Sequence, residues 1–436
     1  MDKKKLRPAL FAAAVFVVTM VIFVLLLFAA ALIPKEAIRE NTLTSARYCC
    51  ETDVYYDHIE GIAGSRIDRY ADSILLNIAW SYARDDVARS VMRSAYYYDK
   101  GYRENENFLK AVLQDLPPTR QYLRYWHGSL AIVRPLLVLF DIQKIYIINA
   151  VLMIALIIAL IVMLLRRGGT FPVIGLIAGL VMVDAWYVTT SLEYMWTFLL
   201  MPLFSAIALK SDEKEGGHTG TAFMLFGMVT AYLDFLTTET ITLLVPLLIL
   251  LWNRRRRGGK EGFVRSAACL AISWGLGYAL CWAGKWLLAA AFLQENVWPY
   301  VGDDIAHRLG GNEFIHLTLS EYLSSALGRN IGTLFPLEYG AAGVTVFVTL
   351  IVMYAYILYV YRGKGADSRL LLVYLCIAAV PYVRYMVLHN HSYLHYFFTH
   401  RAQLGTVLAF VLILCEAGVG RTMASHVSTL RRKGRR

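Results

Sequence analysis

The chain has 436 residues, of which 58% are apolar and only 17% are charged, and its formal net charge is +11. Soluble domains average about 45–50% apolar and about 25% charged residues, so the composition excludes an ordinary soluble domain. The apolar residues form runs of roughly 20, the length at which a helix crosses a bilayer, and they do not alternate with polar residues as in a β-barrel.

The first apolar run covers residues 9–33 and follows Lys3, Lys4, Lys5 and Arg7. It is too long for the apolar region of a signal peptide, so residues 1–33 are predicted to form a retained transmembrane helix. The next stretch carries many acidic residues and no further long apolar run. We predict that residues 34–142 form a large helical extracytoplasmic loop with amphipathic or interfacial helices.

Further apolar runs predict helices over approximately 144–165, 171–189, 195–209, 221–233, 236–252, 266–292, 341–361, 369–388 and 402–416. The chain is thus predicted to be an all-α polytopic membrane protein with about ten transmembrane helices. The predicted parts after the first loop are a transmembrane bundle over 143–292, a second extracytoplasmic loop over 293–340, C-terminal transmembrane helices over 341–420, and a basic tail over 421–436.

Basic residues cluster at the ends of these runs. When the predicted helices alternate in direction, the clusters all fall on one side of the membrane: Arg166 with Arg167, Lys210 with Lys214, residues 254–257, Arg362 with Lys364, and the tail. Cytoplasmic loops carry an excess of Lys and Arg. We therefore expect a multi-pass protein of the cell membrane with both termini in the cytoplasm, and no nucleic-acid partner.

The ionisable residues within the predicted helices lie toward the opposite, extracytoplasmic side. They are Asp141, Asp184, Glu193, Asp234, Glu239, Lys285, Arg384 and Arg401. Charged groups in hydrocarbon are unfavourable and often mark functional sites, although any single one can also be a helix-end residue that reaches the interface. A transporter more often places polar groups near the midplane. The one-sided distribution predicts a polar site under the extracytoplasmic face.

Asp68 and Asp72 are the first candidates for catalysis. They are four residues apart at the start of a helical pattern, which places both carboxylates on one helix face. Such a pair can supply a general base and a group that orients it, while helix capping is the alternative interpretation. Asp53 is a third candidate, two residues after Glu51.

Arg124, Trp126, His127 and Arg134 are candidates for substrate binding. Aromatic rings stack on sugar faces, and arginine binds phosphate oxygens in pairs. An aromatic belt at the membrane interface would show a similar composition. Asp234, in the predicted turn over 234–239, is a further candidate for substrate binding.

The stretch 389–401 holds four histidines between two long apolar runs. His391 and His395 are four residues apart and could share a divalent metal on a helix. No carboxylate accompanies them, so we assign no metal ligands, and a divalent metal cofactor stays an open alternative. Arg384 and Arg401 flank the stretch. Together these cationic and hydrogen-bonding groups suit a phosphate or diphosphate, and a polar interfacial loop is the alternative.

The predicted topology resembles that of the GT-C superfamily of polytopic membrane glycosyltransferases. The segments 68–77, 125–136, 233–238 and 390–401 are also similar to segments of uncharacterised membrane proteins of Gram-positive bacteria. The resemblance implies a polyprenyl-phosphate sugar donor and an acidic catalytic residue in the first outer loop. GT-C enzymes often carry adjacent acidic residues soon after the first helix. This chain instead has Asp53 near Glu51, and the spaced pair Asp68 and Asp72.

From the residues and this resemblance, we expect an enzyme that moves a hexosyl or pentosyl group from a polyprenyl-phosphate donor to a glycan or other cell-envelope acceptor. One of the candidate carboxylates would deprotonate the acceptor hydroxyl. Arg384, Arg401 and the histidines would stabilise the departing lipid phosphate. Three alternatives stay open: a lipid-linked polysaccharide ligase or polymerase, a non-enzymatic transporter or flippase, and a structural membrane protein.

Overall fold

The computed structural model describes residues 3–213, 218–259, 261–309, 317–361, 363 and 365–419. These ranges are nearly all helical, and the strands they contain form a two-stranded antiparallel sheet. The predicted basic tail, Lys214, Arg362 and Lys364 lie outside the described residues. Apart from this small sheet, the prediction of an all-α fold is confirmed for the part of the chain that is described.

Long apolar helices confirm a helical membrane protein. Within the described ranges, six helical stretches are long and apolar enough to cross a membrane. They are Pro8–Ala31 of α1 (Lys3–Ala31), α7 (Ile142–Arg166), α12 (Phe263–Leu293), α15 (Ala341–Tyr361), α16 (Ser368–Val387), and Tyr396–Glu416, which joins α18 (Tyr396–Thr399), η4 (His400–Gln403) and α19 (Leu404–Glu416).

The remaining predicted spans correspond to shorter helices: α8 (Thr170–Met182), α9 (Met195–Asp212), α10 (Thr219–Leu233) and α11 (Ile241–Arg256). Two boundaries differ from the prediction for a local reason. Asp184 has a left-handed backbone with φ 51°, which ends α8 and leads into the 3-10 helix η2 (Ala185–Thr190). Leu236 has φ 66°, and Asp234 accepts its backbone N–H, so α11 begins only at Ile241.

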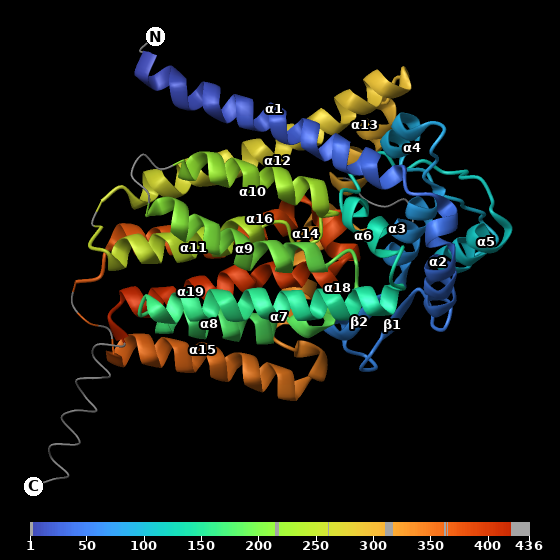
Figure 1. Cartoon of the computed structure of the whole chain (residues 1–436). Helices are drawn as coiled ribbons and strands as arrows, with labels where there is room; N and C mark the ends of the chain where they lie inside the picture. The colour runs from blue at the N-terminus through green and yellow to red at the C-terminus, as the bar shows by residue number, and fades with distance from the viewer. Residues whose placement is uncertain are drawn as a thin grey trace, which may run out of the picture.

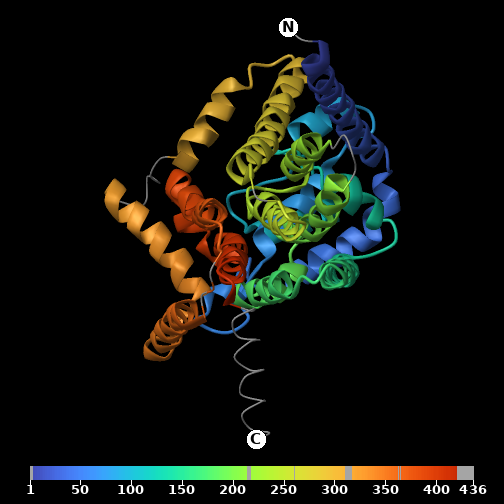
Figure 2. The ribbon, with the colours of Figure 1, turned by 90° about the vertical axis from the view of Figure 1, so that its left-hand side faces the viewer.

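The helices lie side by side in one bundle with α11 at its centre (Figure 1). Every α11 residue from Ile241 to Asn253 is buried. Seen from one end of the bundle, α1 and α15 lie on opposite outer edges (Figure 2). Both edge helices leave most of their apolar side chains exposed, as expected for helices in contact with lipid.

Basic clusters meet at one end of the bundle, which we call the basic end. Arg167 pairs with Glu213 at 2.8 Å, and Arg255 pairs with Glu416 at 2.8 Å. Arg254 pairs with Asp212 at 2.5 Å. These ion pairs bring the ends of α7, α9, α11 and α19 together, so the structure places the described basic loops on a common side.

The opposite end carries a helical cap (Figure 1). Its elements are α2 (Lys35–Cys49), β1 (Tyr55–Asp57), η1 (Ala63–Ser65), β2 (Arg66–Asp68), α3 (Arg69–Ser81), α4 (Val87–Arg93), α5 (Glu104–Gln114) and α6 (Leu130–Leu136). The strands pair with Tyr55 opposite Asp68. The same end also holds α13 (Trp298–Leu309), α14 (Leu319–Leu334), η3 (Leu337–Tyr339) and α17 (His389–Leu394).

Close backbone contacts fix the cap to the bundle. Gly128 donates its N–H to the carbonyl of Tyr232 at 2.9 Å, and a Cβ atom at position 128 would lie only 2.4 Å from that oxygen. The indole of Trp126 donates to the carbonyl of Cys281 at 2.9 Å. Only glycine permits the first approach, so the sequence Trp126-His127-Gly128 docks the cap onto α10 and α12.

Glycines also allow α10 and α12 to pack closely. A Cβ atom at Gly277 of α12 would lie 2.1 Å from the carbonyl oxygen of Met224, and one at Gly227 of α10 would lie 2.0 Å from that of Trp274. Small residues permit this backbone approach between membrane helices. The contact holds α12 in place beneath the cap.

Candidate functional site

A cavity of about 980 Å³ lies where the cap meets the end of the bundle. The cap contributes β1, β2, α3 and the segment 119–127 to its lining. The rest of the lining comes from the turns after η2 and α10, and from α13, α17 and α18. These segments come from residues 55–398 of the chain. Five of the sequence-predicted site residues line this one cavity: Asp68, Arg124, His127, His391 and His395.

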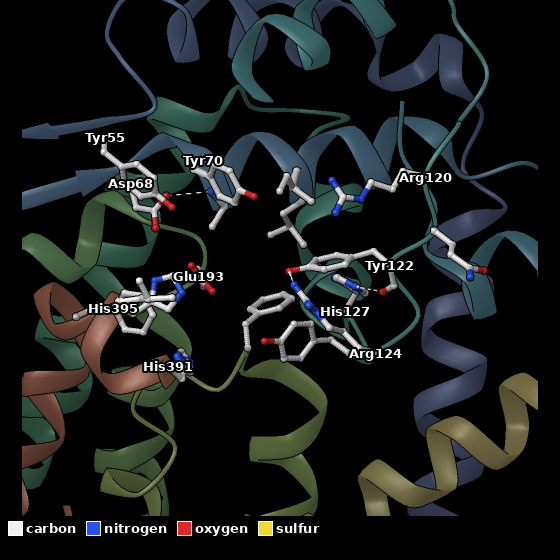
Figure 3. Close-up of a pocket in the computed structure, with 18 of the residues that line it drawn as sticks. Tyr55, Asp68, Tyr70, Arg120, Tyr122, Arg124, His127, Glu193, His391 and His395 are labelled. Carbon is white, nitrogen blue, oxygen red and sulfur yellow. Dashed lines mark hydrogen bonds between the residues drawn. The ribbon is translucent and has the colours of Figure 1, made fainter. Parts of the chain in front are cut away.

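One wall of the cavity is acidic. Asp68 and Glu193 lie on the same side as His391 and His395, with the tyrosine rings of Tyr55 and Tyr70 above them (Figure 3). His391 Nε2 contacts the carbonyl oxygen of Leu236 at 3.0 Å. The imidazoles of His391 and His395 lie edge to face at 4.8 Å.

The facing wall is basic and aromatic (Figure 3). It is built from Arg120, Tyr122, Arg124, Tyr125 and His127. Arg124 donates to the hydroxyl of Tyr122 at 2.7 Å and lies 4.3 Å from the centre of that ring. The two walls carry opposite charges across one cavity, and this polarity is its main chemical feature.

His127 fixes the basic wall rather than adding charge to it. Its ring is buried, and burial lowers its pKa to about 3, so the imidazole is neutral. Nε2 lies 2.9 Å from the carbonyl oxygen of Tyr122 and therefore donates the hydrogen bond. This bond joins Tyr122 to His127, the neighbour of the docked Gly128, and so fixes the segment between them that carries Arg124.

Asp68 is a buried carboxylate at the cavity wall. It ends β2 and caps α3, with Oδ1 accepting the N–H of Ala71 at 2.9 Å. Its Oδ2 accepts the hydroxyl of Tyr194 at 2.5 Å. Only 2% of the side chain is exposed, and burial raises the pKa of the carboxyl to about 6. A carboxylate that takes up a proton near neutral pH is suited to proton transfer.

Asp72 is fully buried behind Asp68 and does not line the cavity. The hydroxyl of Tyr146 donates to Oδ2, and the backbone N–H of Leu192 donates to Oδ1 at 2.8 Å. Burial raises its pKa to about 7. The third candidate, Asp53, is exposed, pairs with Arg103, and also lies outside the cavity lining.

Arg384 and Arg401, which the sequence predicted to bind phosphate, do not line the cavity. Both bind buried groups of the protein instead. Arg384 pairs with Glu239 at 2.9 Å and donates to the carbonyl of Leu236 at 2.8 Å. Arg401 donates to the carbonyls of Val183 and Gly64 at 3.2 and 3.0 Å. Its guanidinium also lies 5.5 Å from the ring of Tyr194, the residue that contacts Asp68.

Three further candidates serve local structure. Arg134 is fully buried and donates to the carbonyls of Ala79 and Ile33, each at 2.8 Å. Asp234 accepts hydrogen bonds within its own turn, and its pKa is raised by burial. Trp126 packs beneath the cap. None of these side chains lines the cavity.

No cluster suited to a metal is present in the described ranges. Among these residues, no group of three or more His, Cys, Asp or Glu side chains could hold a metal ion. His391 and His395 line the cavity together, as the spacing predicted, but they offer only a pair of imidazole ligands.

Neither protein-family models, nor curated proteins, nor solved structures gave a match to the chain.

Sequence reasoning missed part of the cavity. The sequence marks Glu193 only as an ionisable residue near a helix end, because its position beside Asp68 depends on the turn after η2. Arg120 and Tyr122 extend the basic and aromatic stretch that begins at Arg124, so the local composition contained a signal for them. Phe235 carried no such signal, because only the fold brings it to the cavity.

Proposed function

We propose that this protein is a membrane glycosyltransferase that takes a sugar from a polyprenyl-phosphate donor, with a GT-C-like arrangement. The observation that carries the proposal is the polarity of the cavity. A buried carboxyl with a near-neutral pKa faces two arginines across a space lined by tyrosine rings. A phosphorylated sugar needs cationic donors at its phosphate, rings for its faces, and a base at the attacking hydroxyl.

The proposed reaction is a single displacement at the anomeric carbon. Asp68 accepts the proton of the acceptor hydroxyl, and the resulting oxygen nucleophile forms the new glycosidic bond. The bond between the anomeric carbon and the phosphate oxygen breaks, and its electron pair leaves with the phosphate. Arg120 and Arg124 stabilise the negative charge that develops there, because fixed cations in a partly closed site lower the barrier.

The assignment of the phosphate to Arg120 and Arg124 differs from the sequence-based expectation. Arg384 and Arg401 have buried guanidiniums that hold Glu239 and backbone carbonyls. Arg120 and Arg124 instead line the cavity, where a phosphate could reach them. Burial and position thus favour the arginines of the cap.

A row of aromatic rings along α12 supports a lipid-linked donor. Trp274, Tyr278, Trp282 and Trp286 recur at every fourth residue, which puts them on one helix face. Successive ring centres lie 5.0, 6.1 and 5.6 Å apart. Tyr278, Trp282 and Trp286 are half-buried within a helix long enough to cross the membrane.

The outer end of this row meets the basic wall. The ring of Trp282 lies 5.4 Å from that of Tyr125, and the indole of Trp286 donates to the carbonyl of Arg124 at 3.2 Å. A lipid tail placed along α12 would bring its phosphate to the arginines. This continuity from apolar helix face to cationic wall favours a polyprenyl phosphate over a water-soluble donor.

We also propose that the chain crosses the membrane ten times, with the basic end in the cytoplasm. The four shorter helices α8 to α11 would complete the bundle beside the six long ones. The support is the meeting of Arg167, Arg254 and Arg255 at one end, since basic loops stay in the cytoplasm. The cavity would then face the extracytoplasmic side and a cell-envelope acceptor.

The test combines donor binding with transfer by the purified protein. Native mass spectrometry should detect a co-purified polyprenyl phosphate, and the Arg124→Ala variant should bind it about 10- to 100-fold more weakly, because hydrogen bonds to charged groups contribute roughly 1.5–3 kcal/mol. The Asp68→Asn variant should keep binding the donor and lose transfer.

Asp53→Asn is the matched control, because it changes an exposed carboxyl of the same cap outside the cavity lining. It should retain both donor binding and transfer. Full transfer activity in the Asp68→Asn variant would refute the proposed base. Unaltered donor binding in Arg120→Ala and Arg124→Ala would refute the phosphate site.

A further inference from the structure

Asp72 accepts hydrogen bonds from two separate elements. The hydroxyl of Tyr146, from the membrane helix α7, donates to Oδ2. The N–H of Leu192 donates to Oδ1 at 2.8 Å, and the hydroxyl of Ser191 lies 3.5 Å from the same oxygen. The side chain is fully buried. Unlike Asp68, Asp72 is not part of the cavity lining, so its carboxylate contacts other parts of the protein and not the cavity.

The segment that Asp72 holds delivers two groups to the site. We call residues 190–194 the site turn. Glu193 lines the cavity, and the hydroxyl of Tyr194 donates to Asp68 at 2.5 Å. Within the turn, the hydroxyl of Ser191 accepts the N–H groups of Glu193 and Tyr194 at 3.2 and 3.4 Å. Displacement of the turn would therefore move both groups together.

Arg69 strengthens the same attachment. It donates to the hydroxyl of Tyr146 at 2.7 Å and to the carbonyl of Thr190, the first residue of the site turn, at 3.3 Å. It also donates to the hydroxyl of Tyr48 at 2.8 Å. The network ties the first turn of α3, the start of α7 and the site turn into one unit, and Asp72 is the carboxylate that contacts both α7 and the site turn.

We propose that Asp72 is a positioning residue that anchors the site turn, and thereby places Glu193 at the cavity and the Tyr194 hydroxyl against Asp68. This inference builds on the proposed function. It assigns different roles to the two aspartates that the sequence could not distinguish. Asp68 touches the substrate, and Asp72 acts through the turn.

Hydrogen–deuterium exchange of the purified full-length protein tests the anchor without any activity measurement. The Asp72→Ala variant should exchange amides of the site turn about tenfold faster than the wild type, because a charge-assisted hydrogen bond no longer opposes local opening. If that variant does not fold, Asp72→Asn and Ser191→Ala provide milder versions. Unchanged exchange in the folded variants would overturn the proposal.

Tyr48→Phe is the matched control. It removes a hydrogen-bond partner of Arg69 but leaves in place the contacts of Asp72 with Tyr146 and Leu192. Exchange in the turn should then stay at the wild-type rate. Acceleration equal to that of the Asp72 variants would assign the effect to general loosening of the cap and overturn a specific role for Asp72.

Transfer kinetics provide the second measurement. If Asp72 acts through Tyr194, then Asp72→Asn should reduce transfer less in a Tyr194→Phe background than in the wild type. Equal reductions in the two backgrounds would overturn this route of action. If the wild-type protein transfers no sugar, the proposed function fails, while the exchange measurement still decides whether Asp72 anchors the turn.

Discussion

Replacement of Asp68, the proposed base, by asparagine should make the protein more stable. The ordinary pKa of an aspartate is 3.8, and burial raises that of Asp68 to about 6. Between these values, the folded state binds a proton more tightly than the unfolded state. The free energy of unfolding must therefore fall as the pH rises from about 4 to about 6, and it stays lower at higher pH.

The pKa difference sets the size of the effect. One pKa unit corresponds to about 1.4 kcal/mol, so ionised Asp68 lowers the stability by on the order of 3 kcal/mol at pH 8. Asparagine carries no charge and still caps a helix well, so it can keep the bond from Ala71. It loses part of the interaction with Tyr194, and we expect a net gain of about 1–2 kcal/mol.

Thermal unfolding of purified Asp68→Asn and wild-type protein at a series of pH values measures this gain. The variant should melt at a higher temperature at pH 8, and the difference should shrink toward pH 5, where Asp68 is largely protonated. Asp53→Asn should show no such trend, because that side chain is exposed. A variant that melts at or below the wild-type temperature at pH 8 would refute the claim that Asp68 is held ionised at a cost in stability.

Two other substitutions test how the bundle is held together, both measured as melting temperatures of purified protein. Arg384→Ala should lower the stability by about 3–5 kcal/mol because it leaves buried Glu239 unpaired. Arg66→Ala removes the partner of Asp57 in a more exposed ion pair of the cap and should cost about 1 kcal/mol or less. Equal losses would contradict this ranking. Gly277→Ala should destabilise by about 1–3 kcal/mol through its clash with α10, while Gly275→Ala, in the same helix with open space around it, should be neutral or slightly stabilising. Tolerance of both alanines would show that the two helices do not pack as closely as described.

The membrane character of the chain was predictable because it depends on the length and polarity of continuous segments. Helix boundaries were less predictable where a single residue adopts a left-handed backbone, as at Asp184 and Leu236. The sequence also predicted that the described basic loops lie at one end of the bundle. Its ion pairs involve acidic partners such as Glu416, which no local pattern identified.

The candidate site was predictable only in part. Charge and aromatic content drew attention to Asp68, Arg124 and His391, which share the cavity. They drew equal attention to Arg134 and Arg401, whose guanidiniums hold backbone carbonyls. Arg134 binds Ile33, which lies 101 residues away, and Arg401 binds Gly64, which lies 337 residues away. A sequence alone does not reveal whether an arginine meets a carbonyl or a ligand, because the carbonyl is present at every residue.

The cavity described above has a consequence for how the protein is made. Its lining begins at Tyr55 and ends at Phe398, so more than three quarters of the chain separates its first and last contributors. During synthesis the acidic wall cannot form until α17 and α18 have followed the cap and the early helices. A ribosome that stalls before these helices would leave Asp68 without its histidine neighbours. The site can exist only after the late helices have joined the bundle, which ties any activity to complete insertion.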